Sequence, residues 1–208
     1  MKNMEETKIS KSELKLKAIL KAAKDCFARY GYEKTTLDDI GKIARLNKAS
    51  LYYYFKNKED IFIQVVLSEA KDFIEKLQNS ALQAESIEEK IVTYLIARMR
   101  YYRDVLNLHQ LSVTIVQEIQ PKFDEVYQSV KNEEIAYLES ILKQGIKQKV
   151  FELHNSLQIA EVLITIADAL KHEATFRSNT FDMASVDYSK AEKKIEMITK
   201  LILKGLNS

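Results

Sequence analysis

The first feature of the sequence that could do chemistry is a run of three tyrosines, Tyr52, Tyr53 and Tyr54. Leu51 and Phe55 flank the middle of this run four residues apart, so in a helix they lie on one face and pack inward together. Successive helical residues point about 100° apart, so the three tyrosines cannot all face the core. Exposed Tyr hydroxyls can donate to phosphates, and the rings can lie against sugars or thymine methyl groups. The run favours contact with nucleic acid, although core packing or a protein interface is the more common role of an isolated tyrosine run.

The residues around the tyrosines suit the same role. Lys48, at the expected start of this helix, can reach a base edge or a phosphate, and Ala49 and Ser50 are small enough to let the backbone approach the groove floor. Thr36 predicts another helix N-terminus that could bind a phosphate, and Lys58 opens the next helix in the same way. Together these positions predict a surface that binds double-stranded DNA.

Charge is distributed unevenly along the chain. Residues 8–60 contain 13 Lys and Arg against 7 Asp and Glu, a net charge of +6, whereas residues 61–208 contain 18 against 21. A basic N-terminal part on a mildly acidic remainder suggests that only the former meets a polyanion. A solvated lysine-rich face would give the same count, so charge alone does not decide.

The elements that position these residues are predicted to be helices. Four Gly and one Pro in 208 residues favour long uninterrupted helices over turn-rich β structure. Apolar residues recur at helical spacing over residues 12–30. A second, short helix starts at Thr36 with Asp39 in capping-box position, and Asn47 caps a third over residues 48–55. Three short helices with a tight turn between the last two form a helix-turn-helix.

The remainder of the chain is predicted to form longer helices. One begins near residue 57, and the others cover about residues 87–104, 106–119, 122–148, 156–176 and 188–206. The predicted fold is therefore all-α, with an N-terminal three-helix helix-turn-helix head, residues 1–56, followed by a larger helical-bundle body, residues 57–208.

A dense and ordered set of residues lies between positions 18 and 62: Phe27, Gly31, Tyr32, Thr35, Thr36, Ile40, Ala44, Lys48, Leu51, Tyr52, Tyr54, Phe55, Asn57, Lys58 and Glu59. With this set, the segment resembles the DNA-binding domain of the TetR family of bacterial transcriptional repressors. Three positions are notable against the family pattern. Arg45 replaces a turn glycine, and Ala49 replaces a common glycine. Gly41 stands where the family usually has a small residue, and it should weaken the second helix by about 1 kcal/mol relative to Ala.

The resemblance implies a DNA-binding regulator, most commonly a repressor, in the cytoplasm of a bacterium. The predicted DNA contacts combine the residues of three helix N-termini with those of the tyrosine run: Thr35, Thr36, Asn47, Lys48, Ala49, Ser50, Tyr52, Tyr53, Tyr54 and Lys58.

For the body, the resemblance implies a ligand-binding and dimerisation role. The central helices of the family generally enclose a pocket for a small molecule, expected here to be a partly apolar inducer. Candidate pocket residues are the aromatic and polar side chains Tyr94, Tyr102, His109, Phe123 and Tyr127, although an ordinary core or surface role is the more common one for each.

The resemblance also implies that the last two long helices pair with their copies in a homodimer, as they generally do in the family. Two apolar stripes could form either that interface or the core of the bundle: Ile159, Leu163, Ile166 and Leu170 on one helix, and Ile195, Ile198 and Ile202 on the other.

Other classes of protein find little support. Three Ser-x-x-Lys matches, starting at Ser12, Ser68 and Ser140, are what chance gives in a lysine-rich chain, and no zinc, phosphate-loop or dinucleotide motif accompanies them. A single cysteine, Cys26, fits a reducing compartment. We expect no enzyme activity, no metal, no cofactor, no signal peptide and no membrane span.

The leading hypothesis is a homodimeric repressor that binds a palindromic operator and is released by a small-molecule inducer. The alternative keeps the DNA-binding and drops the ligand, leaving a constitutive or partner-controlled regulator. A substantial pocket in the body favours the first, and a solidly packed body favours the second.

Overall fold

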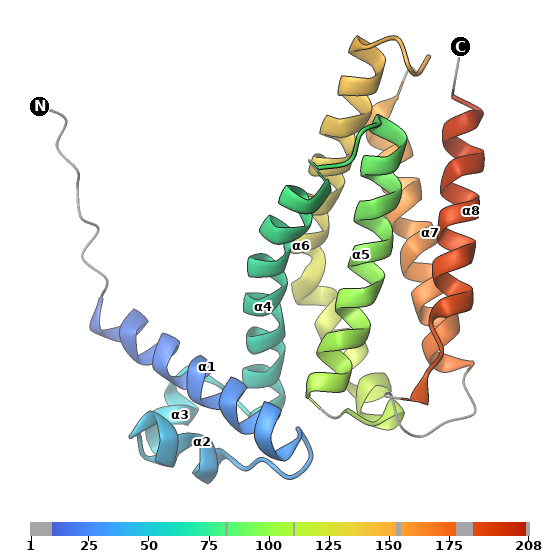
Figure 1. The fold of residues 1–208 in the computed structure, drawn as a ribbon. Coiled ribbons are helices and arrows are strands. Elements are labelled where there is room, and N and C mark those ends of the chain that lie inside the picture. The colour runs from blue at the N-terminus through green and yellow to red at the C-terminus, as the bar shows by residue number, and fades with distance from the viewer. Residues whose placement is uncertain (1–9, 82, 110, 153–154, 178–184, 207–208) are drawn as a thin grey trace, which may run out of the picture. The chain divides into compact units, whose positions relative to one another are not determined.

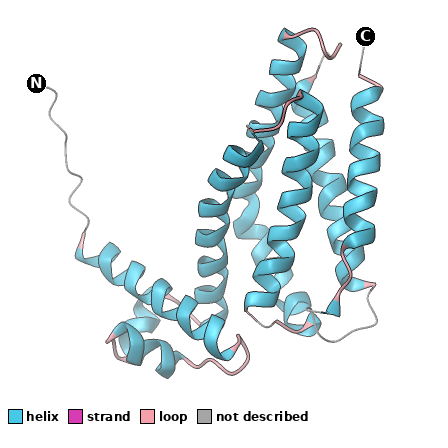
Figure 2. Ribbon diagram, viewed as in Figure 1, coloured by secondary structure: helices cyan, strands magenta, loops and turns pink. Residues whose placement is uncertain are grey.

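The computed structural model describes residues 10–81, 83–109, 111–152, 155–177 and 185–206, and the regular structure within these ranges is helical (Figure 2). The predicted all-α class is confirmed. The chain divides into two compact units, Met1–Val66 and Leu67–Ser208. The division falls within one helix, α4 (Lys58–Ala81), and the predicted boundary after residue 56 lies just before that helix.

The first unit, which we call the head, contains α1 (Lys11–Tyr30), α2 (Leu37–Ala44) and α3 (Lys48–Tyr54) (Figure 1). Each begins at a side chain that caps its N-terminus. The hydroxyl of Ser10 accepts from the backbone of Glu13, and Thr36 and Asp39 form the predicted reciprocal capping box of α2. Asn47 accepts from the backbone N–H of Ser50 at the start of α3. These local bonds fix where the three helices start.

An aromatic cluster joins the start of α4 to the head. The ring of Phe62 packs edge-on against Phe27 at 5.3 Å and against Tyr32 at 4.9 Å, measured between ring centroids. Phe62 and the neighbouring Ile61 are almost completely buried. Burying two such side chains contributes about 3–6 kcal/mol, so the first turns of α4 belong to the head.

The turn between α2 and α3 depends on Gly41. This glycine lies four residues before Arg45, the position at which the family pattern has its turn glycine. Arg45 takes the left-handed conformation at the turn (φ 56°, ψ 40°), and the backbone N–H of Leu46 donates to Gly41 O at 2.9 Å. A Cβ on Gly41 would stand 2.7 Å from the carbonyl oxygen of Leu46. Gly41 therefore permits the close approach of the turn, a role that its helix propensity does not reveal.

We predict that Gly41→Ala lowers the free energy of unfolding by about 1–3 kcal/mol, because the added methyl group displaces the backbone of the turn. Helix propensity alone predicts the opposite sign, a gain of about 1 kcal/mol. Gly205→Ala is the matched control, since a Cβ there meets its nearest atom at an ordinary 3.4 Å. Thermal and urea unfolding of both variants distinguish the steric effect from the effect of helix propensity. A stabilised Gly41→Ala protein would contradict the steric account.

The second unit, which we call the body, contains the rest of α4 and four antiparallel helices that alternate in direction (Figure 1). Their bounds are α5 (Ile87–Leu108), α6 (Val113–Lys147), α7 (Ser156–Phe176) and α8 (Ser189–Lys204).

One boundary prediction in the body is wrong. Residues 106–119 and 122–148 were expected to be two helices separated by Pro121, but α6 continues through Pro121 for 35 residues. A proline inside a helix removes one hydrogen bond and costs about 3 kcal/mol. Buried side chains on both sides of it, Val116, Ile119 and Val130, bind this helix to the bundle and offset that cost.

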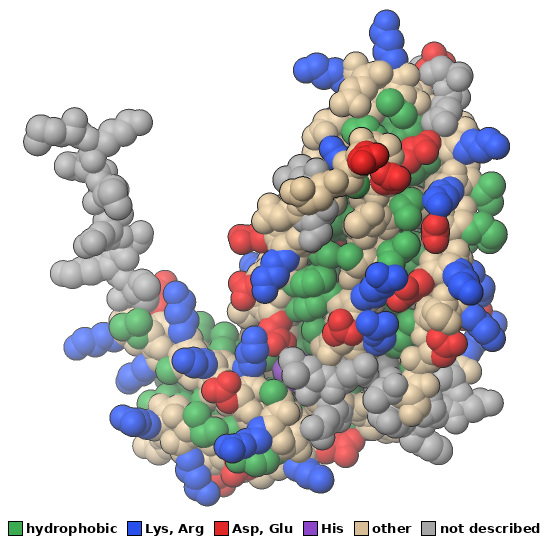
Figure 3. All heavy atoms as spheres, viewed as in Figure 1, with side chains coloured by type: hydrophobic (Ala, Val, Ile, Leu, Met, Phe, Trp, Pro, Cys, Tyr) green, Lys and Arg blue, Asp and Glu red, His purple; other side chains and the backbone are tan. Residues whose placement is uncertain are grey.

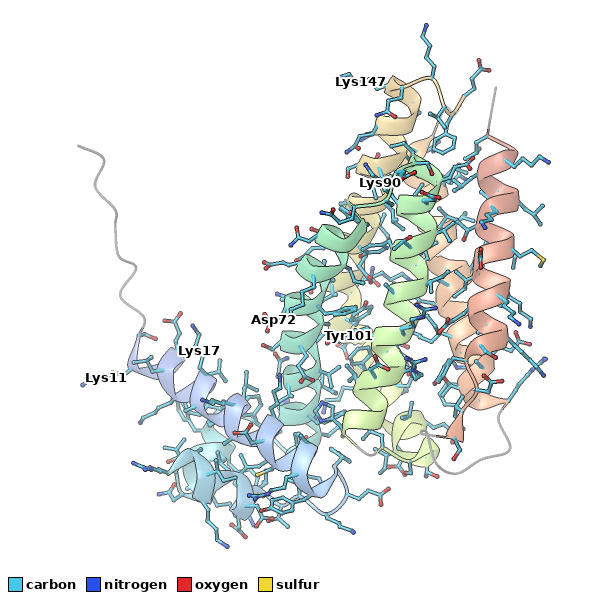
Figure 4. All side chains as sticks on the ribbon, viewed as in Figure 1. Lys11, Lys17, Asp72, Lys90, Tyr101 and Lys147 are labelled. Carbon is cyan, nitrogen blue, oxygen red and sulfur yellow. The ribbon has the colours of Figure 1, made fainter. Side chains whose placement is uncertain are left out.

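The body segment of α4 packs through aromatic and polar contacts. Phe73 stacks on Tyr101 of α5 with 3.7 Å between ring centroids, and Tyr101 lies on the side of α5 toward α4 (Figure 4). The hydroxyl of Tyr137 on α6 donates to the carbonyl oxygen of Gln78 at 3.2 Å. One continuous helix thus belongs to both units.

Candidate DNA interface and ligand cavity

The exposed face of α3 carries the candidate DNA contacts. Leu51 and Phe55 are buried, which turns the opposite side of this short helix to solvent. Tyr53 is 80% exposed and Tyr52 is 51% exposed, unusual fractions for aromatic side chains. The Lys48 side chain is 51% exposed, at 3.8 Å from Asp38. The structure therefore brings a lysine and two tyrosines together on one accessible surface.

Ala49 is exposed beside Lys48, and Ser50 is half-buried because its hydroxyl donates to Asn47 Oδ1 at 2.8 Å. Tyr54 is also half-buried and points back toward α1, where the Ser12 hydroxyl donates to it at 3.4 Å. Its ring meets that of Tyr53 edge-on at 5.0 Å. Tyr54 thus supports the exposed ring of Tyr53 from behind.

Two predicted contacts lie inside the head. Thr35 is 1% exposed, and its hydroxyl donates to Gly31 O at 2.8 Å. The Lys58 ammonium donates to the carbonyl oxygens of Tyr32 and Glu33 at 2.8 and 3.2 Å, and burial lowers its pKa. In this structure Thr35 and Lys58 hold the loop after α1 in place, and their contact with DNA stays a prediction.

Thr36 and Asn47 are exposed, but each uses its side-chain oxygen as a helix cap. The first turn of α2 also carries Asp38 and Asp39, and a hydrogen bond from Thr36 holds the pKa of Asp39 below its usual range. Two carboxylates repel a phosphate, so the N-terminus of α2 is poorly suited to bind one. The α3 face is the better-formed surface, and Lys and Arg side chains are spread over the head around it (Figure 3).

A cavity of about 440 Å³ lies in the body between α5, α6 and α7. It is lined by aromatic, amide and charged side chains: Tyr102, Gln120, Asp124, Tyr127, Gln128, Lys131, Thr165, Asp168, Ala169, Lys171, His172 and Phe176. This volume is at the small end of the roughly 300–1,000 Å³ typical of small-molecule sites.

One buried guanidinium organises the wall of this cavity. Arg98 Nε on α5 donates to Glu134 Oε1 on α6 at 2.7 Å, and Arg98 Nη1 donates to Asp168 Oδ1 on α7 at 2.8 Å. The hydroxyls of Tyr94 and Tyr127 also donate to Glu134. Arg98 and Glu134 are 8% and 1% exposed, so water screens their attraction little. Arg98 thus joins three helices at one point.

Asp168 collects two further cations. Lys171 Nζ donates to its Oδ1 at 3.1 Å, and Lys131 Nζ lies 3.3 Å from its Oδ2. Burial alone would raise the pKa of Asp168, but Arg98 and Lys171 hold it well below its usual range. Burial lowers the pKa of Lys171, and Arg98 lowers it further against the opposing effect of Asp168. Three cations therefore surround one ionised carboxylate.

The five predicted pocket residues are only partly brought together. Tyr102 and Tyr127 line the cavity. Tyr94 lies buried behind its wall on Glu134, and Phe123 stacks on Tyr127 at 5.1 Å without lining the cavity. His109 is completely buried, lies 2.9 Å from Glu69 on α4 and does not line this cavity.

The sequence analysis did not identify the buried ion pair behind the cavity wall, Arg98 and Glu134. Glu134 stands four residues from buried Val130 and four from buried Leu138, and Arg98 follows Leu95 on the apolar side of α5. A charged residue within an apolar stripe was the available signal, because such a residue is buried only with a partner. The identity of that partner lies on another helix and is not visible from spacing.

We predict that Arg98→Met lowers the free energy of unfolding by about 3–5 kcal/mol, because Glu134 would remain buried without its cation. Arg100→Met is the control: this arginine lies on the same helix, pairs with Glu192 at 2.9 Å and is 55% exposed. Its loss should cost about 1 kcal/mol or less. Chemical unfolding followed by circular dichroism measures both, and equal losses would show that Arg98 is not the organising residue.

The described residues contain no group of three or more His, Cys, Asp or Glu side chains placed to hold a metal ion. None of their helices is both long and apolar enough to cross a membrane. Cys26 is buried in the head, and burial raises the pKa of its thiol.

Comparison with known proteins places this architecture. A family model described as bacterial regulatory proteins of the tetR family matches residues 19–65. The chain is 30% identical over 135 residues to the uncharacterized HTH-type transcriptional regulator YhgD of Bacillus subtilis, covering 63% of this chain and 69% of that protein.

Another relative is the biofilm operon icaADBC HTH-type negative transcriptional regulator IcaR of Staphylococcus epidermidis, 27% identical over 53% of this chain and 62% of that protein. Among solved structures, a transcriptional regulator from Cytophaga hutchinsonii superimposes with a TM-score of 0.74 and 27% identity, covering 93% of this chain and 99% of that one. The match to the solved structure extends over both units, whereas the family model covers only the region from α1 to the start of α4.

Proposed function

This chain belongs to the TetR family of bacterial regulatory proteins and is a transcriptional regulator, and we propose that it is a ligand-responsive repressor that binds a palindromic DNA operator as a homodimer. Repression is supported by the name of IcaR, a negative regulator. We propose that it acts on the chromosome, in the bacterial cytoplasm.

The observation that carries DNA-binding is the exposed face of α3. Tyr52 and Tyr53 expose large apolar rings at a free-energy cost in water, and a surface of this kind is retained where it meets a partner. With Lys48 beside them and a net charge of +6 over residues 8–60, that partner is a polyanion. We therefore propose that Lys48, Ala49, Ser50, Tyr52 and Tyr53 enter the major groove.

We predict that Tyr53→Ala weakens operator binding about 5- to 150-fold, since a lost phosphate or base contact costs roughly 1–3 kcal/mol. Lys48→Met should also reduce the slope of log affinity against log salt by about 1 for each bound head, because one released counterion is lost. The probe is the duplex that the purified protein retains best from a random library, measured by fluorescence anisotropy.

Tyr30→Ala is the matched control, because Tyr30 is also an exposed tyrosine of the head, at 44%, but lies on α1. Its binding should equal that of the unchanged protein. If Tyr53→Ala and Lys48→Met both bind as tightly as this control with their folds intact, α3 is not the recognition helix.

A dimer is proposed because one short helix reads only a few base pairs, too few to select a site in a genome. The body exposes apolar side chains on its last two helices: Leu157 and Val162 on α7, and Met197 and Leu201 on α8. They differ from the expected stripes, because Leu163 and Ile195 are buried within one chain and Ile198 is only half-exposed. The surface available to a second copy lies further around both helices.

We predict that Leu201→Asp gives monomers, because a carboxylate buried without a partner in a dimer interface costs several kcal/mol. Leu201 is 62% exposed in the single chain, so the fold of the monomer should persist. Leu14→Asp, at a leucine of the head that is 55% exposed, should leave the dimer unchanged. Sedimentation velocity with circular dichroism tests both. An unchanged protein that sediments as a monomer at micromolar concentration would contradict the dimer.

Ligand response is supported by the cavity, which favours the inducible hypothesis over a constitutive regulator. The cavity lies among α5, α6 and α7, and α4 contacts α5 through Phe73 and α6 through Gln78. Because α4 continues into the head, movement of these helices around a ligand can be transmitted to the spacing of two heads on an operator.

A further inference from the structure

We propose that the cavity between α5, α6 and α7 takes a small organic anion, with its carboxylate or equivalent group on Lys131 and Lys171 and its apolar part on Tyr102 and Phe176. This inference rests on the proposed ligand response and specifies the chemistry of its ligand. It replaces a general expectation of a partly apolar molecule with a charge requirement.

The charge of the inner wall carries the inference. Arg98, Lys131 and Lys171 bring three positive charges to one cluster, and Glu134 and Asp168 bring two negative charges. One positive charge is left over in a part of the protein where burial makes an uncompensated charge costly. An anion in the cavity removes this imbalance, whereas a cation increases it.

The two lysines have the geometry to hold such an anion. Both line the cavity, and the contacts among the described residues place each ammonium against a single oxygen of Asp168. An ammonium carries three N–H donors, so each lysine retains donors for a ligand. Lys131 comes from α6 and Lys171 from α7, so an anion between them would bridge two helices.

The other acidic residue of the lining does not offset this charge. Asp124 is exposed and accepts from Gln120 Nε2 at 2.6 Å, so water and salt screen it strongly. The inner lysines are 15% and 28% exposed, and their field on a ligand is screened less.

Aromatic side chains define the rest of the ligand. Lys171 Nζ lies 4.6 Å from the ring centroid of Tyr102, and Phe176 contacts His172 at 4.2 Å between ring centroids. These rings and that of Tyr127 line the same cavity. A volume of about 440 Å³ admits a compact molecule with one ring or a short chain.

The electrostatics of Lys171 agree with this placement. Burial and the Arg98 guanidinium lower the pKa of Lys171, which makes its charged form costly. A bound anion would stabilise the charged form, so protein and ligand would each favour the other's ionised state.

Three probes of similar skeleton and different charge test the proposal: phenylacetate, phenethyl alcohol and phenethylammonium. Titration calorimetry of the whole chain should show phenylacetate binding about tenfold more tightly than the alcohol, and the ammonium binding most weakly, because charge-assisted hydrogen bonds form only to the anion. Equal or tighter binding of the alcohol or the ammonium would overturn the proposal, as would the absence of binding by all three up to about 10 mM.

Lys131→Met should reduce the affinity for phenylacetate to that for the alcohol, about a tenfold loss. Lys143→Met is the control on the same helix, since Lys143 is 61% exposed and pairs with Glu139 outside the cavity. Equal effects of the two substitutions would show that Lys131 does not hold the anion.

The outcome is separate from that of the proposed function. If phenylacetate binds but leaves operator affinity unchanged, the anion site stands and ligand response fails. If the operator is bound but no anion is, the regulator stands and the anion site fails.

Discussion

The body of this protein depends on the burial of one arginine. Arg98 is paired with Glu134 and Asp168, so three helices must lie within hydrogen-bond reach of a single guanidinium. Removing such charges from water costs much of what their attraction returns, so their contribution is geometric more than stabilising. The cavity lies beside this network, between the same three helices α5, α6 and α7, where polar groups stand in place of an apolar core.

The head uses two separate sets of aromatic residues, one in its core and one on its surface. Its stability comes from Phe27, Tyr32 and Phe62, while its exposed surface comes from Tyr52 and Tyr53. The aromatic residues that hold the fold are therefore not the ones available to DNA. Hydrogen bonds from Thr35 and Lys58 hold the loop between α1 and α2 in place.

The two units share α4, and this helix would carry the proposed ligand response to the DNA-binding head. The helix begins among the aromatic residues of the head and continues to Phe73 and Gln78 in the body. A ligand changes DNA affinity only if it prefers one arrangement of the body helices over another. An anion bound by both Lys131 on α6 and Lys171 on α7 would have that preference, because its binding free energy would depend on the distance between the two helices.

The sequence by itself determined the helical class, the capped starts of α2 and α3, and the outward direction of Tyr52 and Tyr53, because these follow from contacts within a few residues of one another. It failed at Pro121, where packing from other helices outweighs a local breaker, and it did not reveal the close approach of Gly41 to the carbonyl of Leu46 across a turn. Only the tertiary structure decided that Arg98, Glu134 and Asp168 form one network. Its bonds join residues 36 and 70 positions apart, and periodicity cannot pair charges that lie on different helices.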